Sequence, residues 1–235
     1  MMLMVMNVVF YAVLACAALT VLAWCVSQWL NKWQAGVFVG VAAGLAVVAL
    51  LVQMIAICVS GQVMTVEGIL AISAFVFALS TCYMHFRLMG SGVAPIAAII
   101  ILLCEIGIRF SSSLVVALFM ETQLDAPWIK QAFVLFAVGL GLALAYMLLG
   151  VITELRFHRM CEETSELDKY VTELMPKMVS HFGWWALFIL SFALGAYLLW
   201  SQTLYGVYWI WQPIFVILVV VWLIVFIAKD VLKIR

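Results

Sequence analysis

Charge is what this sequence has least of. Its 235 residues include 11 Lys and Arg and 11 Asp and Glu, which make up 9% of the chain and leave no net charge. The chain has no basic patch, so we do not expect it to bind nucleic acid. Hydrophobic residues form 69% of the chain, against roughly 45–50% in soluble domains, and the mean hydropathy is +1.28. No soluble core of this size buries so much apolar surface, so the sequence predicts an all-α, polytopic membrane protein.

Paired cysteines of the CxxC type are also absent. The sequence therefore contains neither a zinc site of that type nor a c-type haem attachment. Five of the six cysteines lie in apolar stretches, where we expect them to pack as small hydrophobic side chains. The N-terminus, MMLMVMNVVF, lacks a basic n-region and a small-residue cleavage pattern, so we expect it to begin the first span rather than a removable signal peptide. The cysteines are Cys16, Cys25, Cys58, Cys82, Cys104 and Cys161.

Apolar runs predict seven membrane spans within a single integral membrane domain that covers residues 1–235. Each run is long enough for one crossing of about 20 residues, and polar, Gly or Pro residues separate the runs. The fourth is long for one crossing, and Glu105, Arg109 and the serines from Ser111 to Ser113 interrupt it. The predicted spans are 3–30, 36–59, 67–86, 93–119, 128–152, 182–200 and 209–228.

The basic residues predict the orientation of these spans, because Lys and Arg are enriched in cytoplasmic loops. With seven spans, nine of the eleven Lys and Arg fall on one side, which places the N-terminus outside and the C-terminus in the cytoplasm. The exceptions are Arg109, inside the fourth span, and Lys130, on the outer side. The nine are Lys32, Arg87, Arg156, Arg159, Lys169, Lys177, Lys229, Lys233 and Arg235.

The segment 153–180 is the one extended polar stretch, and we expect it to be a cytoplasmic loop. Ser165 and Asp168 resemble a capping box, and apolar residues then recur at helical spacing. This pattern predicts a short amphipathic helix on the membrane surface that stops near Pro176. A regulatory docking role for this helix is an alternative.

Ionisable residues within the spans are candidates for a ligand site. Glu105 and Arg109 are four residues apart, so they share one helix face and can pair. Such groups normally point into the bundle or a wet cavity. The pair is either a structural ion pair or the polar floor of a ligand site, in which Arg109 meets a carboxylate. Glu67, at the outer end of the third span, is expected to line the same outer cavity.

Three histidines lie at or near the predicted cytoplasmic face. His85 and His158 each lie close to an arginine and are expected to be ordinary interfacial residues. His181 opens the sixth span and is the best single candidate for a metal ligand, with an uncommitted interfacial histidine as the alternative.

Large aromatic residues concentrate between the sixth and seventh spans, on the predicted outer side. Flat, amphipathic rings suit stacking on a planar apolar ligand. The alternative is an interfacial aromatic belt, which is common in membrane proteins. The segment reads W-S-Q-T-L-Y-G-V-Y-W-I-W-Q-P over residues 200–213.

The order of these residues resembles the tryptophan-rich signature of the cytochrome c assembly family, whose pattern is approximately W-x4-W-G-x-Y-W-x-W-D-P. Six positions match in register, while Tyr205 replaces a Trp and Gln212 replaces the Asp. Weaker similarities are Leu167-Asp168 before the sixth span, Ser60-Gly61-Gln62 followed by Glu67, and Trp128 at the start of the fifth span. The matching residues are Trp200, Gly206, Tyr208, Trp209, Trp211 and Pro213.

The resemblance implies that the aromatic loop is an outward-facing platform for haem, to which histidines supply axial ligands. The positions of two family histidines fall at Ala132 and near Lys229-Asp230, and a further helix with an outer histidine has no counterpart before Arg235. Ile214 and Phe215 follow the signature where the family typically has polar residues. The implied cofactor-binding residues are Trp200, Tyr205, Gly206, Tyr208, Trp209 and Trp211, with Glu67 and Arg109 lining the same side.

The sequence thus supports three functional hypotheses, none with a predicted catalytic residue. The first is a divergent, shortened cytochrome c biogenesis protein that handles haem at the outer face of a bacterial-type inner membrane. Its expected partners are lipid, other membrane or periplasmic subunits and c-type cytochromes. The second is a non-catalytic membrane-anchor subunit of a redox or respiratory complex. The third, a transporter, has only Glu105 and Arg109 in its favour and lacks visible inverted repeats.

Overall fold

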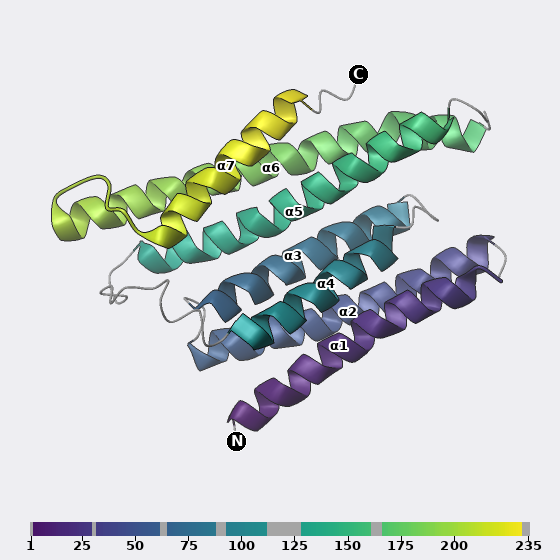
Figure 1. Cartoon of the computed structure of the whole chain (residues 1–235), viewed down its shortest axis with the longest axis horizontal. Coiled ribbons are helices and arrows are strands. Elements are labelled where there is room, and N and C mark those ends of the chain that lie inside the picture. Colours follow the sequence, from purple (N-terminus) through teal and green to yellow (C-terminus); the bar gives the residue numbers. More distant parts are fainter. Residues whose placement is uncertain are drawn as a thin grey trace. The chain divides into compact units, whose positions relative to one another are not determined.

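The computed structural model describes residues 2–29, 32–61, 65–87, 93–111, 128–160 and 166–231. This part of the chain contains seven helices and no strand, so the all-α prediction is confirmed (Figure 1). The helices are α1 (Met2–Ser27), α2 (Lys32–Ser60), α3 (Val66–Arg87), α4 (Val93–Ser111), α5 (Ile129–Met160), α6 (Glu166–Tyr205) and α7 (Pro213–Val231).

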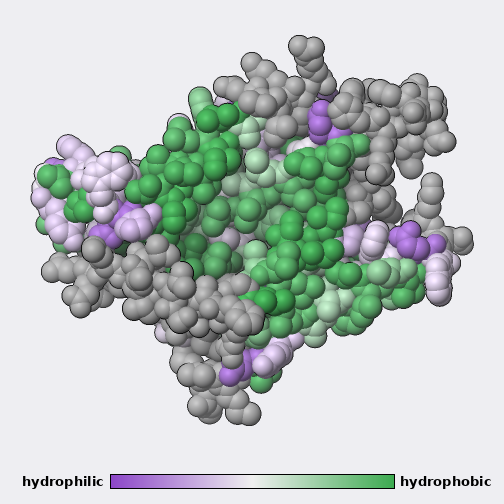
Figure 2. Space-filling view, viewed as in Figure 1, coloured by the Kyte–Doolittle hydropathy of each residue, from purple (hydrophilic) through white to green (hydrophobic). Residues whose placement is uncertain are grey.

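Five of these helices are long and apolar enough to cross a membrane, namely α1, α2, α3, α5 and α6. The apolar parts of α4 and α7, Val93–Ile106 and Pro213–Lys229, are shorter. Figure 2 shows hydrophobic residues over the middle of the helices and paler, more polar residues toward their ends. This distribution is that of an integral membrane protein.

The prediction that the helix in the segment 153–180 stops near Pro176 is wrong. Helix α6 begins at Glu166 and runs through Pro176 to Tyr205, so the polar segment and the sixth span form one 40-residue helix. A proline inside a helix removes one backbone hydrogen bond and bends the helix, but the bonds on both sides remain. Helix α5 likewise continues to Met160, beyond the predicted end of the fifth span at residue 152. The predicted 28-residue loop is therefore mostly helical.

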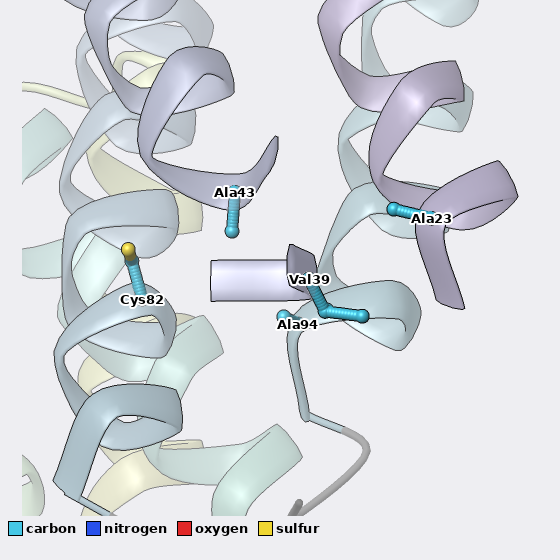
Figure 3. Packing of buried hydrophobic residues seen from close by; sticks show 5 residues of the cluster. All are labelled: Ala23, Val39, Ala43, Cys82 and Ala94. Carbon is cyan, nitrogen blue, oxygen red and sulfur yellow. The ribbon is translucent and has the colours of Figure 1, made fainter. Parts of the chain in front are cut away.

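The chain divides into two compact units, residues 1–118 with α1 to α4 and residues 119–235 with α5 to α7. In the first unit, α2 packs on α1 and α3, and α4 packs on α1 and α3. One layer of its core brings together the end of α1, the start of α2, the end of α3 and the start of α4 (Figure 3). Neighbouring helices along the chain therefore run antiparallel. The layer consists of Ala23, Val39, Ala43, Cys82 and Ala94.

His85 joins α3 to α2 near this layer. Its side chain is buried, and its Nε2 lies 3.0 Å from the carbonyl oxygen of Gly36, to which Nε2–H donates. Gly40, one turn further along α2, lets the helices approach, because a Cβ there would lie 2.8 Å from the ring of Phe86. The prediction that His85 is an ordinary interfacial residue is wrong, since it forms a buried link between two helices.

In the second unit, α5 and α6 lie antiparallel along most of their length (Figure 1). Two glycines permit this close packing. A Cβ on Gly139 of α5 would lie 2.6 Å from Leu190 Cδ2, and one on Gly183 of α6 would lie 2.9 Å from the ring of Tyr146. Small residues are the usual means by which helices approach in lipid, where tails are as apolar as the side chains.

We predict that Gly139→Val lowers the stability of the protein by about 1–3 kcal/mol, the usual cost of overpacking, because the new side chain meets the fully buried Leu190. Gly195→Ala is the matched control in α6, since a Cβ there meets no atom within 4 Å. Unfolding of both variants in mild detergent measures the difference. Equal stability of the two variants would contradict the close packing of α5 on α6.

Candidate functional site

A cluster of stacked aromatic rings forms the base of the aromatic segment in the second unit. Tyr197 of α6 stacks on Phe215 of α7, with ring centroids 3.6 Å apart and planes 17° apart. Trp200 stacks on Tyr197 at 5.6 Å, and Phe133 of α5 meets Phe215 edge to face at 5.6 Å. All four side chains are buried. The cluster therefore holds the start of α5, the end of α6 and the start of α7 together at one end of the unit.

Side chains of α6 hold the loop 206–212 onto this base. The Ser201 hydroxyl donates to the carbonyl of Val207 at 2.8 Å, and the Tyr197 hydroxyl donates to the carbonyl of Ile210. At the end of the loop, the carbonyl of Gln212 accepts from the backbone N–H of Phe215 at 3.0 Å. Pro213 is the first residue of α7, a position that suits its fixed φ and missing donor. The loop is thus attached at its beginning, middle and end.

Gly206 ends α6. Its φ is +70°, and its N–H donates to the carbonyl of Gln202 at 3.1 Å, the geometry of a left-handed residue after a helix. A Cβ at Gly206 would meet no protein atom within 4 Å. Termination of the helix therefore accounts for this glycine in the aromatic signature without close approach of a ligand.

The rings beyond the base are open to the surroundings. The exposed fractions are 48% for Tyr205, 69% for Tyr208 and 78% for Trp211, while Trp209 is half-buried. Trp209 and Trp211 meet edge to face, with centroids 5.8 Å apart and planes 80° apart. The two rings point in different directions, because Trp209 turns inward to contact Tyr197 at 5.2 Å. Figure 2 shows the pale residues that gather over this loop, where the green surface of α6 and α7 ends.

Trp200 is the member of the aromatic signature that is fully buried. It lies inside α6, is fully buried and contributes to the base rather than to an exposed platform. Trp128 and Lys130, at the start of α5, are exposed at the same end of the unit as the loop, because Phe133 one turn later contacts Phe215. This end of the unit therefore combines exposed aromatic rings with one cation.

Three buried polar atoms near the loop lack a hydrogen-bond partner within the described part of the chain. They are the indole Nε1 of Trp200, the indole Nε1 of Trp209 and Oε1 of Gln202. Buried polar groups in proteins are nearly always paired with protein or ordered water. These three atoms are exceptions to that pattern among the described residues.

The predicted ligand residues Glu67, Glu105 and Arg109 lie in the first unit. Glu105 is fully buried on α4 and accepts a hydrogen bond from Gln53 Nε2 of α2 at 3.2 Å. The carboxyl of Glu67, in the first turn of α3, is close enough to interact electrostatically with Glu105. The structure therefore brings Glu67 near Glu105, and their lining of a ligand cavity stays a prediction. Arg109 is in α4, but its side chain lies outside the described residues, so its pairing with Glu105 stays a prediction.

His181, the predicted metal ligand, is exposed on α6, and its Nδ1 lies 2.6 Å from the carbonyl of Lys177. At about 1.5 Å per residue, it is roughly 36 Å along the helix from Tyr205 and the loop. The side chain of His158 lies outside the described residues. The described side chains include no group of three His, Cys, Asp or Glu arranged to hold a metal ion.

Comparisons with protein-family models, with curated proteins and with solved structures give no match for this chain. The resemblance to the cytochrome c assembly family thus depends on the residues of the aromatic segment.

Sequence reasoning missed the residues that support the loop. Tyr197 is three residues before Trp200, a helical spacing that places both on one face, and this signal was available. Phe215 stood out only as an apolar residue where the family is polar, and its stacking on Tyr197 explains that difference. Ser201 and Gln53 carried no signal, because their partners are a loop carbonyl and a side chain 52 residues away.

We predict that Tyr197→Phe loosens the loop by about 0.5–1.5 kcal/mol, the usual net contribution of one hydrogen bond, because the carbonyl of Ile210 loses its donor. Limited proteolysis of the loop in detergent measures this effect. Tyr205→Phe is the matched control, since the Tyr205 ring contacts Trp200 while its hydroxyl makes no hydrogen bond to a described residue. Equal cleavage of the two variants would show that the Tyr197 hydroxyl does not hold the loop.

Proposed function

We propose that this chain binds a flat, largely apolar ligand of the haem class on its aromatic loop, at the outer face of a bacterial-type inner membrane. The observation that carries the proposal is the group of exposed rings on a fixed aromatic base. Tyr205, Tyr208 and Trp211 expose from 48% to 78% of their surface, yet the loop between them is attached to α6 at two carbonyls. Rings held in place bind a planar ligand with little loss of side-chain entropy.

The polar groups around the rings fit the edges of such a ligand. Haem carries two carboxylates, and Lys130, which is exposed at the start of α5, is a suitable partner for an anionic group. Haem iron, when bound, accepts His, Met, Cys or Tyr as an axial ligand. Among the described residues of the loop and the adjacent end of α6, the phenols of Tyr205 and Tyr208 are of this kind.

The orientation of the chain is part of the proposal. Seven spans with the N-terminus outside place the aromatic loop at the outer face and nine of the eleven basic residues in the cytoplasm. The helices fit this arrangement, because α5 and α6 are antiparallel and α7 returns from the loop. Helix α7 crosses with a short apolar stretch, which neighbouring helices and local thinning of the bilayer accommodate.

A second function has one observation in its favour. His181 lies roughly 36 Å along α6 from the loop, so among the described side chains of the second unit no histidine reaches iron at the loop. A membrane-anchor subunit needs no such ligand and would use the same exposed rings to dock a partner subunit. In that case the aromatic residues act as interface anchors, a role in which Tyr and Trp are enriched.

The first experiment adds haemin to the purified protein and records the Soret band together with the subunit composition of the same sample. We expect the wild type to give a shifted Soret band, and we expect Trp209→Leu combined with Trp211→Leu to remove it, because the stacking surface is lost. Since Trp209 also packs on Tyr197, Trp211→Leu alone is measured as well. Trp185→Leu is the control, as this ring is exposed on α6 far from the loop.

The outcomes separate the two functions. A wild type that leaves the haemin spectrum unchanged would refute the haem-class ligand. Loss of a stoichiometric partner from the Trp211→Leu protein, without a spectral change, would instead support the anchor subunit. Should pigment and partner both survive the substitutions, the loop is only an interfacial belt.

Orientation has its own test. In variants that keep a single cysteine, we expect Cys161 to react only when a maleimide reagent enters the cytoplasm. Cys58, exposed near the far end of α2, serves as the control that the same reagent reaches from outside. Labelling of Cys161 in intact cells by an impermeant reagent would refute the seven-span orientation.

A further inference from the structure

The first unit contains a pair of polar side chains that takes no part in the proposed aromatic site. Gln53 of α2 donates from Nε2 to Oε2 of Glu105 on α4 at 3.2 Å. Glu105 has an exposed fraction of 0%. The second oxygens of both groups, Oε1 of Glu105 and Oε1 of Gln53, are buried and have no partner among the described residues. Two groups that already share one hydrogen bond therefore each have a free acceptor.

A single proton, bound to Oε1 of Glu105 and donated to Oε1 of Gln53, satisfies both of these oxygens. A carboxylic acid and a primary amide form a cyclic pair, in which the amide N–H donates to one carboxyl oxygen and the carboxyl O–H donates to the amide oxygen. With an ionised carboxylate, Oε1 of Glu105 and Oε1 of Gln53 are both acceptors, so no second bond forms. An ionised carboxylate inside an apolar bundle also loses its hydration without replacement. The neutral acid removes both costs.

We propose that Gln53 and Glu105 form a proton-binding site inside the membrane part of the first unit. Glu105 carries the proton on Oε1 and donates it to Oε1 of Gln53, while Gln53 Nε2 donates to Oε2 of Glu105. Uptake of a proton forms one O–H bond and converts the carboxylate of Glu105 to the acid. Release of the proton breaks that bond and restores the carboxylate. The two residues come from α2 and α4, so the loaded pair also joins these helices.

A second carboxyl group lies near the pair. Glu67 of α3 is close enough to Glu105 to interact with it electrostatically. Glu67 is partly buried in the first turn of α3, at the end of the unit where α2 ends and α3 begins. Glu67 is therefore the group through which we expect the proton to exchange. Intramembrane carboxyls of this kind typically mark proton relays.

The remaining titratable groups of the unit do not replace Glu67 in this role. Cys104 is adjacent to Glu105 on α4 and is neutral as a thiol. His85 and Arg87 are in the last turn of α3, at the opposite end from Glu67. Arg109 is one turn beyond Glu105, with its side chain outside the described residues. Helices α1 and α2 contribute Tyr11, Cys16, Cys25 and Cys58, and Lys32 is at the far end of α2. Helix α3 also contributes Cys82 and Tyr83, in its C-terminal half.

Infrared spectroscopy of the full chain in lipid tests the protonation state. At neutral pH we expect the carbonyl stretch of a protonated carboxyl group in the wild type, and we expect Glu105→Gln to remove it. Glu154→Gln, at an exposed position of α5, is the matched control and leaves the band in place. Absence of any such difference between Glu105→Gln and the control would overturn the proposal.

The exchanged pair provides the sharper test. Gln53→Glu combined with Glu105→Gln restores an acid facing an amide, so we expect the band to return and the unfolding midpoint to stay at the wild-type value. Glu105→Gln alone should unfold as the wild type does, because an amide replaces the neutral acid in shape and hydrogen bonding. The ion pair of Glu105 with Arg109 predicts the reverse, since Glu105→Gln then leaves a buried cation unpaired. A large drop in the unfolding midpoint of Glu105→Gln would therefore overturn the proposal in favour of that ion pair.

Discussion

Close approach of apolar helices is the constraint on which the rest of this structure depends. In lipid the hydrophobic effect does not drive helices together, so association depends on van der Waals contact and a few hydrogen bonds. Gly139 of α5 lets that helix contact Leu190 of α6, and Gly183 of α6 lets its helix contact Tyr146 of α5. In the first unit, alanines fill the same role in the layer around Val39. Small residues at the interface leave the large side chains on the outside, as the many exposed Val, Leu, Ile and Phe residues show.

Both candidate sites follow from this packing. The antiparallel course of α5, α6 and α7 brings Phe133, Tyr197 and Phe215 to one end of the second unit, where they form the base of the aromatic loop. Packing of α2 and α4 in the first unit brings Gln53 to Glu105. In each case a polar atom is buried without a partner in the described chain. The aromatic loop leaves indole donors unpaired, and the acid–amide pair leaves acceptors.

The two sites differ in how close together their residues lie along the sequence. Five of the six signature residues that match the family lie within eight positions, from Gly206 to Pro213, so sequence reading found the segment. It assigned Trp200 and Gly206 to ligand contact, whereas the structure places Trp200 in the base and uses Gly206 to end α6. The partner of Glu105 was expected at i+4 on the same helix, because only local pairs are visible in a sequence. Gln53 is 52 residues away and became a partner only through the packing of α2 on α4.

Sequence alone determined that the chain is helical, that it belongs in a membrane and which segments are apolar, since composition and run length decide these properties directly. It predicts six of the seven helix starts to within a few residues and fails for α6, because a proline typically ends a helix whereas α6 runs through Pro176. Tertiary structure decided which rings are base and which are exposed, and which carboxyl meets which amide. These outcomes depend on the direction in which each side chain leaves its helix and on how closely neighbouring helices approach, which no single helix specifies.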